Sequence, residues 1–187
     1  MTKRNGNPEQ SAGERSTGDH GQDHDPKKML SIYLDDHWAG AGAGLSLAKR
    51  LAAENEGTQW YAEIRRVADA IDEDQRTLGR LRETYAGGGF SVKRMLAQGA
   101  ERVGRLKLNG SLVGYTPLAR VLELEALIAG VKSKRLLWRS LRRTDVAQNV
   151  DLDYMESRAK EQIDTLISIH KEASAIAFAE REPALRV

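Results

Sequence analysis

The stretch WYAEIRRVADAIDEDQRTLGRLRETY, residues 60–85, decides the fold. Its apolar positions alternate spacings of four and three residues, which keeps them on one side of an α-helix. These positions are Trp60, Ile64, Val67, Ile71, Leu78, Leu81 and Tyr85. Asp74 occupies the one remaining slot in the series. A carboxylate in such a slot must be paired, bound to a metal, or placed at the edge of the apolar face.

Three further segments carry the same helical period. The four long helices are predicted over residues 26–55, 59–86, 117–143 and 153–181. Asp25 before Pro26 and Thr116 before Pro117 each combine an N-cap residue with a proline at the first helical position. The sequence therefore marks the starts of the first and third helices most clearly.

Weaker signals mark the other helix starts. Thr58 can cap the second helix, and Asp153 with Glu156 forms an acidic version of the capping box for the fourth. Between the second and third helices, Ser91 can cap a shorter helix over about 91–107. No segment reads as a β-strand.

The lengths of the connections indicate how the helices pack. The first two and the last two helices are joined tightly, whereas about 30 residues join the two hairpins. One long crossover between antiparallel hairpins is the ferritin-like arrangement. We therefore expect an all-α fold, an antiparallel four-helix bundle of ferritin-like type with a short extra helix in the crossover. A simple up-and-down order is the alternative. Residues 26–182 would form this domain, and residues 1–25 a disordered polar tail.

Composition narrows the class of protein. The chain has no cysteine, which excludes disulfide scaffolds and thiolate metal sites. It has no run of 18 apolar residues, and its first 28 residues lack an apolar signal segment, so neither a membrane span nor a secretory signal is predicted. Hydrophobic residues make up 40% and charged residues 30%, the balance of a soluble protein. We expect a cytoplasmic protein that does not associate with membranes.

Each long helix carries one ionisable residue within its apolar face: His37, Asp74, Glu125 and His170. With turns near residues 56–57 and 147, hairpin geometry places Asp74 within one turn of His37, and Glu125 beside His170. The favoured interpretation is two carboxylate–histidine hydrogen bonds that fix helix register. A metal site for iron or another divalent metal, and exposure at the edge of the face, are the alternatives.

Alanine and glycine alternate from Ala39 to Gly44 in the first helix. Each glycine costs a helix about 1 kcal/mol. We therefore expect a neighbouring helix to approach closely at Gly40 and Gly44. A phosphate-binding loop is excluded because no predicted strand precedes the glycines.

Residues 91–143 form a basic block with twelve basic and three acidic residues, a net charge of +9. Its densest part is a basic patch at the end of the third helix: Lys132, Lys134, Arg135, Arg139, Arg142 and Arg143. Basic residues late in a helix favour its dipole and can pair with acidic neighbouring helices. A nucleic acid or other polyanion, or an acidic protein partner, would use the same charge.

Three segments carry a family resemblance: LDDHWAGAGAG, GRLKLNG and LARVLELEALIAGVKSKRLLWRSL, residues 34–44, 104–110 and 118–141. The amino-acid sequences of these segments resemble an actinobacterial family of uncharacterised proteins. The arrangement of helices from Leu34 to Ala179 resembles a ferritin-like bundle. Ferritin-like di-iron enzymes carry Glu-x-x-His on two helices. This chain has Ile167 three positions before His170 and no histidine in its second helix, so it departs from that pattern.

The sequence therefore favours a non-catalytic ferritin-like bundle with a structural or protein-interaction role, in which the chain forms a homo-oligomer or binds an acidic protein. A divergent metal-binding protein of di-iron type is the first alternative. Polyanion or nucleic-acid binding through the basic face of residues 91–143 is the second.

Overall fold

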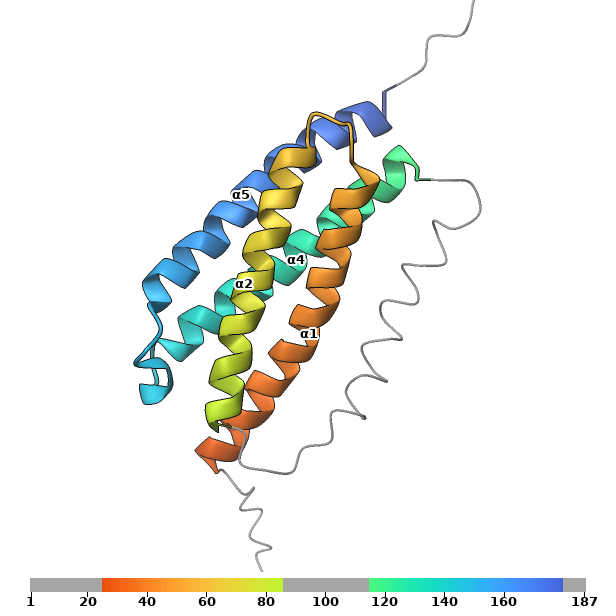
Figure 1. Cartoon of the computed structure of the whole chain (residues 1–187). Coiled ribbons are helices and arrows are strands. Elements are labelled where there is room, and N and C mark those ends of the chain that lie inside the picture. Colours follow the sequence, from red (N-terminus) through yellow and green to blue (C-terminus); the bar gives the residue numbers. More distant parts are fainter. Residues whose placement is uncertain (1–24, 86–114, 180–187) are drawn as a thin grey trace, which may run out of the picture.

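The computed structural model describes residues 25–85 and 115–179 (Figure 1). These residues form four long helices, a single 3-10 turn and no strand, which confirms the all-α prediction for this part of the chain. The helices are α1 (Pro26–Glu54), α2 (Tyr61–Tyr85), α4 (Pro117–Leu141) and α5 (Leu152–Ala177), with the turn η1 (Asp145–Ala147) before α5. Most of the predicted tail, the predicted short helix at 91–107 and the last residues of the predicted domain lie outside the described residues.

Two of the predicted helix starts are confirmed by their caps. The backbone N–H of Lys27 donates to the Asp25 carboxylate at 3.0 Å, and that of Ala119 donates to the Thr116 hydroxyl at 3.1 Å. Each bond satisfies an amide that the first helical turn leaves without an intrahelical partner.

The predicted capping box of the fourth helix is wrong. The N-cap is Asp151, which accepts from the Tyr154 amide at 2.9 Å. Asp153 and Glu156 instead bind arginines, because Arg142 lies 2.6 Å from Asp153 and several α4 arginines converge on Glu156. Because α5 begins at Leu152, Asp153 already lies in its first turn and Asp151 takes the N-cap position.

The turn between α1 and α2 lies later in the sequence than the prediction placed it. Asn55 is the C-cap of α1, and Gly57 adopts a φ of 81°, which glycine allows at little cost. Thr58 accepts from the Trp60 amide at 3.3 Å, and α2 begins at Tyr61. This small displacement changes which residues of α1 and α2 face each other.

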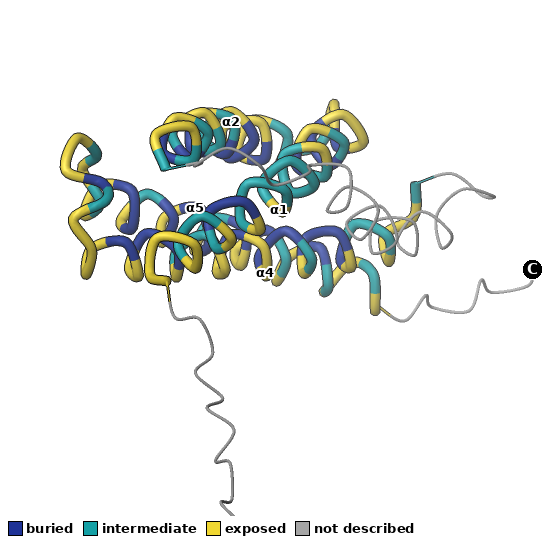
Figure 2. Tube along the Cα trace, turned by 90° about the horizontal axis from the view of Figure 1, so that it is seen from below, coloured by how far each residue is buried: buried dark blue, intermediate teal, exposed yellow. Residues whose placement is uncertain are grey.

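The helices lie in two layers. In Figure 1, α2 returns alongside α1 and α5 returns alongside α4, and Figure 2 shows the first pair on one side of the molecule and the second on the other. Between the layers, α1 packs most extensively against α4. α2 ends at the opposite end of the molecule from the start of α4 (Figure 1).

The core lies between the two layers. It is built from side chains such as Leu51, Ile64, Leu124, Trp138 and Leu166, each fully buried. Burying one such side chain stabilises the fold by about 1.5–3 kcal/mol. None of the described helices is long and apolar enough to cross a membrane.

The expected close approach at Gly40 and Gly44 is wrong. A Cβ built at either glycine would meet no heavy atom of the described residues within 4 Å. Gly42 is the glycine that lies against α2, where its Cβ position would be 3.4 Å from the Gln75 amide nitrogen. The reason is rotational: Asp35, two turns before Gly42, pairs with Arg82, so this side of α1 faces α2.

Candidate functional site

Three contacts set the register between α1 and α2. Asp35 forms an ion pair with Arg82, the Trp38 indole nitrogen lies 3.5 Å from the Cβ position of Gly79, and Gly42 faces Gln75. Residue numbers rise along α1 as they fall along α2, so Asp74 lies level with about residue 43. It is displaced from His37 by about six residues, or roughly 9 Å at 1.5 Å per residue. The predicted His37–Asp74 pair is therefore wrong.

Asp74 is buried at the centre of a charged network that spans both layers. Its carboxylate forms ion pairs with Lys134 of α4 and Arg158 of α5, and it accepts from the Gln162 amide at 3.1 Å. Lys134 also donates to the Gln162 oxygen at 2.5 Å, and Arg158 reaches Glu73 at 2.7 Å. The buried Asp74 and the exposed Glu73 thus neutralise the two cations, one inside the bundle and one at its surface.

Burial disfavours the protonated, charged form of Lys134. Removal from water lowers the pKa of the Lys134 ammonium, and the adjacent Asp74 carboxylate opposes that shift. Two cations and an amide already bind the carboxylate, and the positive charges of Lys134 and Arg158 would repel a divalent metal there. The network fits the prediction that a carboxylate in this slot is paired, with Lys134 and Arg158 in place of a histidine.

His37 lies half-buried on α1 against an aromatic neighbour. Its ring meets the Tyr33 ring edge-on, with 4.6 Å between the centroids. Burial lowers the pKa of His37, although the negative charge of Asp36 acts in the opposite direction. Tyr33 donates to the Ser140 hydroxyl at 3.4 Å, so this pair of rings lies at the contact of α1 with α4.

The second predicted pair is present, but it lies at the surface. The His170 Nε2 atom is 3.1 Å from the Glu125 carboxylate, as the α4–α5 turn near residue 147 predicts. The Glu125 side chain is 54% exposed and that of His170 is 29% exposed. The third interpretation of the sequence, exposure at the edge of the apolar face, therefore applies to Glu125.

The four predicted metal ligands do not form one site. Asp74 is bound by cations, His37 contacts Tyr33, and Glu125 with His170 lies on the outer side of the other hairpin. Across residues 25–85 and 115–179, no three His, Asp or Glu residues come together in a way that could hold a metal ion. The alternative interpretation of one metal site at His37, Asp74, Glu125 and His170 is therefore wrong in its geometry, because the register of α1 and α2 separates the first two.

Most of the predicted basic patch is neutralised within the molecule. Glu156 accepts from Arg135 at 3.2 Å, from Arg139 at 2.5 Å and from Arg142 at 3.0 Å. Hydrogen bonds from Arg139, together with the other two arginines, lower the pKa of Glu156. Lys134 belongs to the Asp74 network. Of the six basic side chains, Lys132 and Arg143 alone form no ion pair with a described residue.

A second buried carboxylate, Glu123, was not predicted. It accepts from Arg50 at 2.6 Å and from the Tyr115 hydroxyl at 3.3 Å. Removal from water raises the pKa of Glu123, and the positive charge of Arg50 limits the shift. Burial also raises the pKa of the Tyr115 phenol. The sequence predicted that Glu125 lies within the apolar face of its helix. In the structure, the rotation of α4 about its own axis turns Glu123 toward α1 instead.

The buried end of α1 belongs to the same cluster. The Asn55 amide donates to the Leu51 carbonyl at 2.7 Å, and its oxygen accepts from Arg120 at 2.6 Å. The Arg120 guanidinium lies 4.9 Å from the centre of the Trp60 ring. These contacts connect the α1–α2 turn to the start of α4, which makes the cluster a clamp at one end of the bundle.

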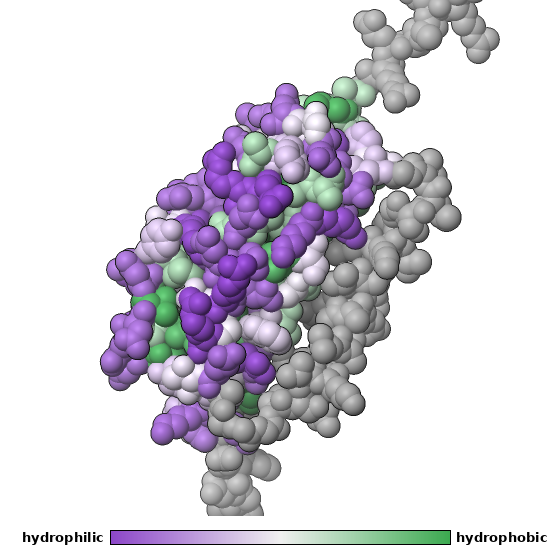
Figure 3. Space-filling model, in the orientation of Figure 1, coloured by the Kyte–Doolittle hydropathy of each residue, from purple (hydrophilic) through white to green (hydrophobic). Residues whose placement is uncertain are grey.

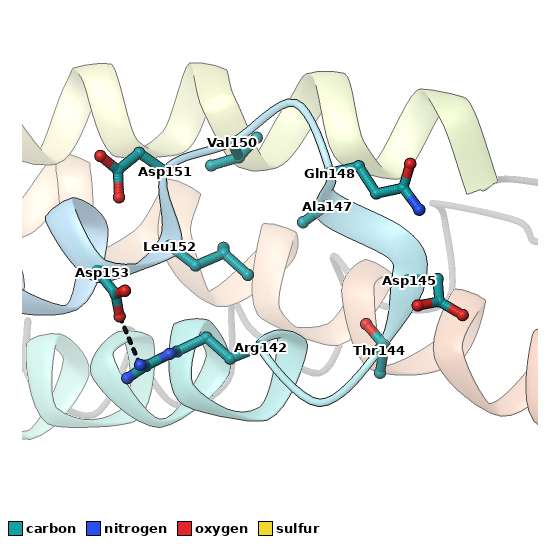
Figure 4. Close-up of a pocket in the computed structure, with 9 residues that line it drawn as sticks. All are labelled: Arg142, Thr144, Asp145, Ala147, Gln148, Val150, Asp151, Leu152 and Asp153. Atoms are coloured by element: carbon teal, nitrogen blue, oxygen red, sulfur yellow. Dashed lines mark ion pairs between the residues drawn. The ribbon is translucent and has the colours of Figure 1, made fainter.

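A shallow pocket of about 390 Å³ lies in the turn between α4 and α5. Figure 4 shows Asp153 directed toward Arg142, and the two are 2.6 Å apart. Asp151, which also lines the pocket, caps α5. These two carboxylates therefore already have structural partners.

The side of α4 that does not pack against the core carries exposed leucines among charged and small residues. Six exposed residues follow one another at spacings of four and three: Leu118, Leu122, Glu125, Ala129, Lys132 and Leu136. The three leucines are 51%, 37% and 58% exposed. In Figure 2, exposed segments of α4 lie on the side away from α1 and α2. The opposite face, over α1 and α2, is mainly hydrophilic (Figure 3).

Comparison with known proteins gives no relative for this chain: no protein family, no curated protein and no solved structure matches it.

Proposed function

We propose that this chain is a non-catalytic helical bundle that binds another protein through the outer face of α4. The observation that carries the proposal is the outer stripe of α4, in which three leucines and an alanine share one helix face with Glu125 and Lys132 and face solvent. A stripe of this kind is what one helix presents to another in a coiled coil or a helix–groove contact. Isolated exposed leucines are ordinary, whereas three of them on one helix face, together with an alanine, indicate a candidate interface.

The interior of the bundle supports a structural rather than a chemical role. Its buried carboxylates are each held by basic side chains: Asp74 by Lys134 and Arg158, and Glu123 by Arg50. A carboxylate that binds a basic side chain of another helix orients the two helices. Asp35 and Glu156 are held in the same way.

The bundle is of the ferritin-like type in this proposal. Its support is the order of the helices: two hairpins, with α2 ending at one end of the molecule and α4 starting at the other (Figure 1). In a ferritin-like fold, the second and third long helices likewise end and start at opposite ends of the bundle. The resemblance to an actinobacterial family of uncharacterised proteins is part of the same proposal.

A photo-crosslinking experiment in living cells tests the interaction. A photoreactive phenylalanine analogue replaces Leu122 or Leu136 on α4, and a matched control replaces Arg66, which is exposed on α2. We expect discrete crosslinked species, from a second copy or another protein, at the two α4 positions and none at the control. Equal or absent crosslinking at all three positions would contradict the proposal.

A further inference from the structure

The part of the exposed α4 stripe from Leu122 to Leu136 is close to symmetric about Ala129. Leu122 and Leu136 stand seven residues before and after Ala129, while Glu125 stands four before it and Lys132 three after it. Reversing the direction of the helix therefore exchanges leucine with leucine and places the acidic residue where the basic one was.

We propose that the partner of this face is a second copy of the chain, packed α4 against α4 about a two-fold axis near Ala129. In a two-fold interface, each contact occurs twice because residue i meets residue j and j meets i. Reversed α4 helices would place Glu125 of each copy opposite Lys132 of the other, and Leu122 opposite Leu136. The inference rests on the proposed function and names its partner.

The charges at these positions are available for such contacts. The Glu125 side chain is 54% exposed and binds His170 through one oxygen, Oε1. Lys132 is exposed and forms no ion pair with a described residue. Two intermolecular ion pairs would therefore form without breaking any that the fold uses.

The centre of the stripe allows two helices to come close. Ala129, Gly130 and Ser133 are small and exposed, and a Cβ built at Gly130 meets no described heavy atom within 4 Å. Small residues at a crossing point let helix backbones approach, while the leucines on either side supply the apolar contact. Ile167 of α5 is 45% exposed and, by the register of the Glu125–His170 pair, lies level with this centre.

Charge reversal on the full-length chain tests the two-fold geometry by analytical ultracentrifugation. We expect a wild-type dimer whose dissociation constant rises about tenfold or more in Glu125→Lys and in Lys132→Glu, since each variant sets like charges opposite each other twice. The double variant exchanges the two charges and should recover the wild-type constant. An equimolar mixture of the single variants should form a heterodimer.

Arg66→Glu reverses a charge on α2 and serves as the matched control, with dimerisation unchanged. Circular dichroism verifies that every variant folds. A monomeric wild-type chain, or a dimer insensitive to both reversals, would overturn the two-fold interface. If the chain is monomeric yet position 122 still crosslinks to a different protein in cells, this inference fails and the proposed function stands. The absence of both dimer and crosslink contradicts both.

Discussion

Asp74 on α2 and Lys134 on α4 form an ion pair in the interior, across the two layers of the bundle. The residues are 60 positions apart in sequence and belong to different hairpins. Arg158 of α5 binds the same carboxylate, so three of the four helices converge there. The pair therefore fixes how the hairpins sit on each other.

Replacing Asp74 with alanine should destabilise the fold by about 3–5 kcal/mol, because Lys134 would stay buried without a carboxylate and Arg158 would keep only the exposed Glu73. Urea denaturation measures the change. Asp69→Ala is the matched control on the same helix, since its pair with Arg65 is exposed and worth about 0.3–0.5 kcal/mol. A loss below about 1 kcal/mol for Asp74→Ala would contradict a central role for the network.

The Asp74 site shows what the sequence could and could not predict. Helical periodicity correctly placed the carboxylate in a buried slot, since periodicity depends only on the residue's own helix. The partners of Asp74 depend on the register between α1 and α2. The turn after α1 lies about two residues later than expected. Because the two helices run in opposite directions, this shift changes the facing residues by about four positions. Lys134 looked like part of a solvent-exposed patch, because nothing in its own segment reveals that a carboxylate faces it.

The α4–α5 hairpin was predicted better for the same physical reason. Its turn lies where the sequence placed it, so Glu125 and His170 do meet. The rotation of α4 was harder to predict because the helix is apolar on two sides. The sequence therefore did not distinguish the core stripe from the outer one, and Glu125 was placed inside while the buried Glu123 was missed.

Acid should weaken the contribution of the Glu156 cluster. The arginines lower the pKa of Glu156 from 4.5 in the folded state, so its stabilisation is present above 4.5 and is lost as pH falls through the folded value. We expect the melting temperatures of wild type and Glu156→Gln to differ near neutral pH and to converge as the pH falls well below 4.5. The exposed Glu161 of the same helix provides a control, in which Glu161→Gln should follow wild type at every pH.

His37 should affect stability in a different pH range. Burial lowers its pKa below 6.5 in the folded state, so the unfolded chain takes up a proton first on acidification. The associated stability is fully present above 6.5 and decreases as pH falls toward the folded value. NMR titration of the ring should give a pKa below 6.5, and His37→Gln should lose less stability than wild type between about pH 7 and 5.5. A ring that titrates above 6.5 would show that Asp36 outweighs burial.

Two adjacent leucines of α4 provide the sharpest test of its two apolar faces. Leu137 is 1% exposed in the core, and Leu136 is 58% exposed on the outer stripe. Leu137→Ala should cost about 2–5 kcal/mol of unfolding free energy because it leaves a cavity. Leu136→Ala should change the free energy of unfolding by no more than about 0.5 kcal/mol, measured at a protein concentration where the chain is monomeric.

The same substitution should weaken the α4–α4 dimer, since Leu136 would meet Leu122 of the second copy. Equal destabilisation by the two substitutions would mean that Leu136 is covered within its own chain, and the outer stripe would no longer be free to bind a partner.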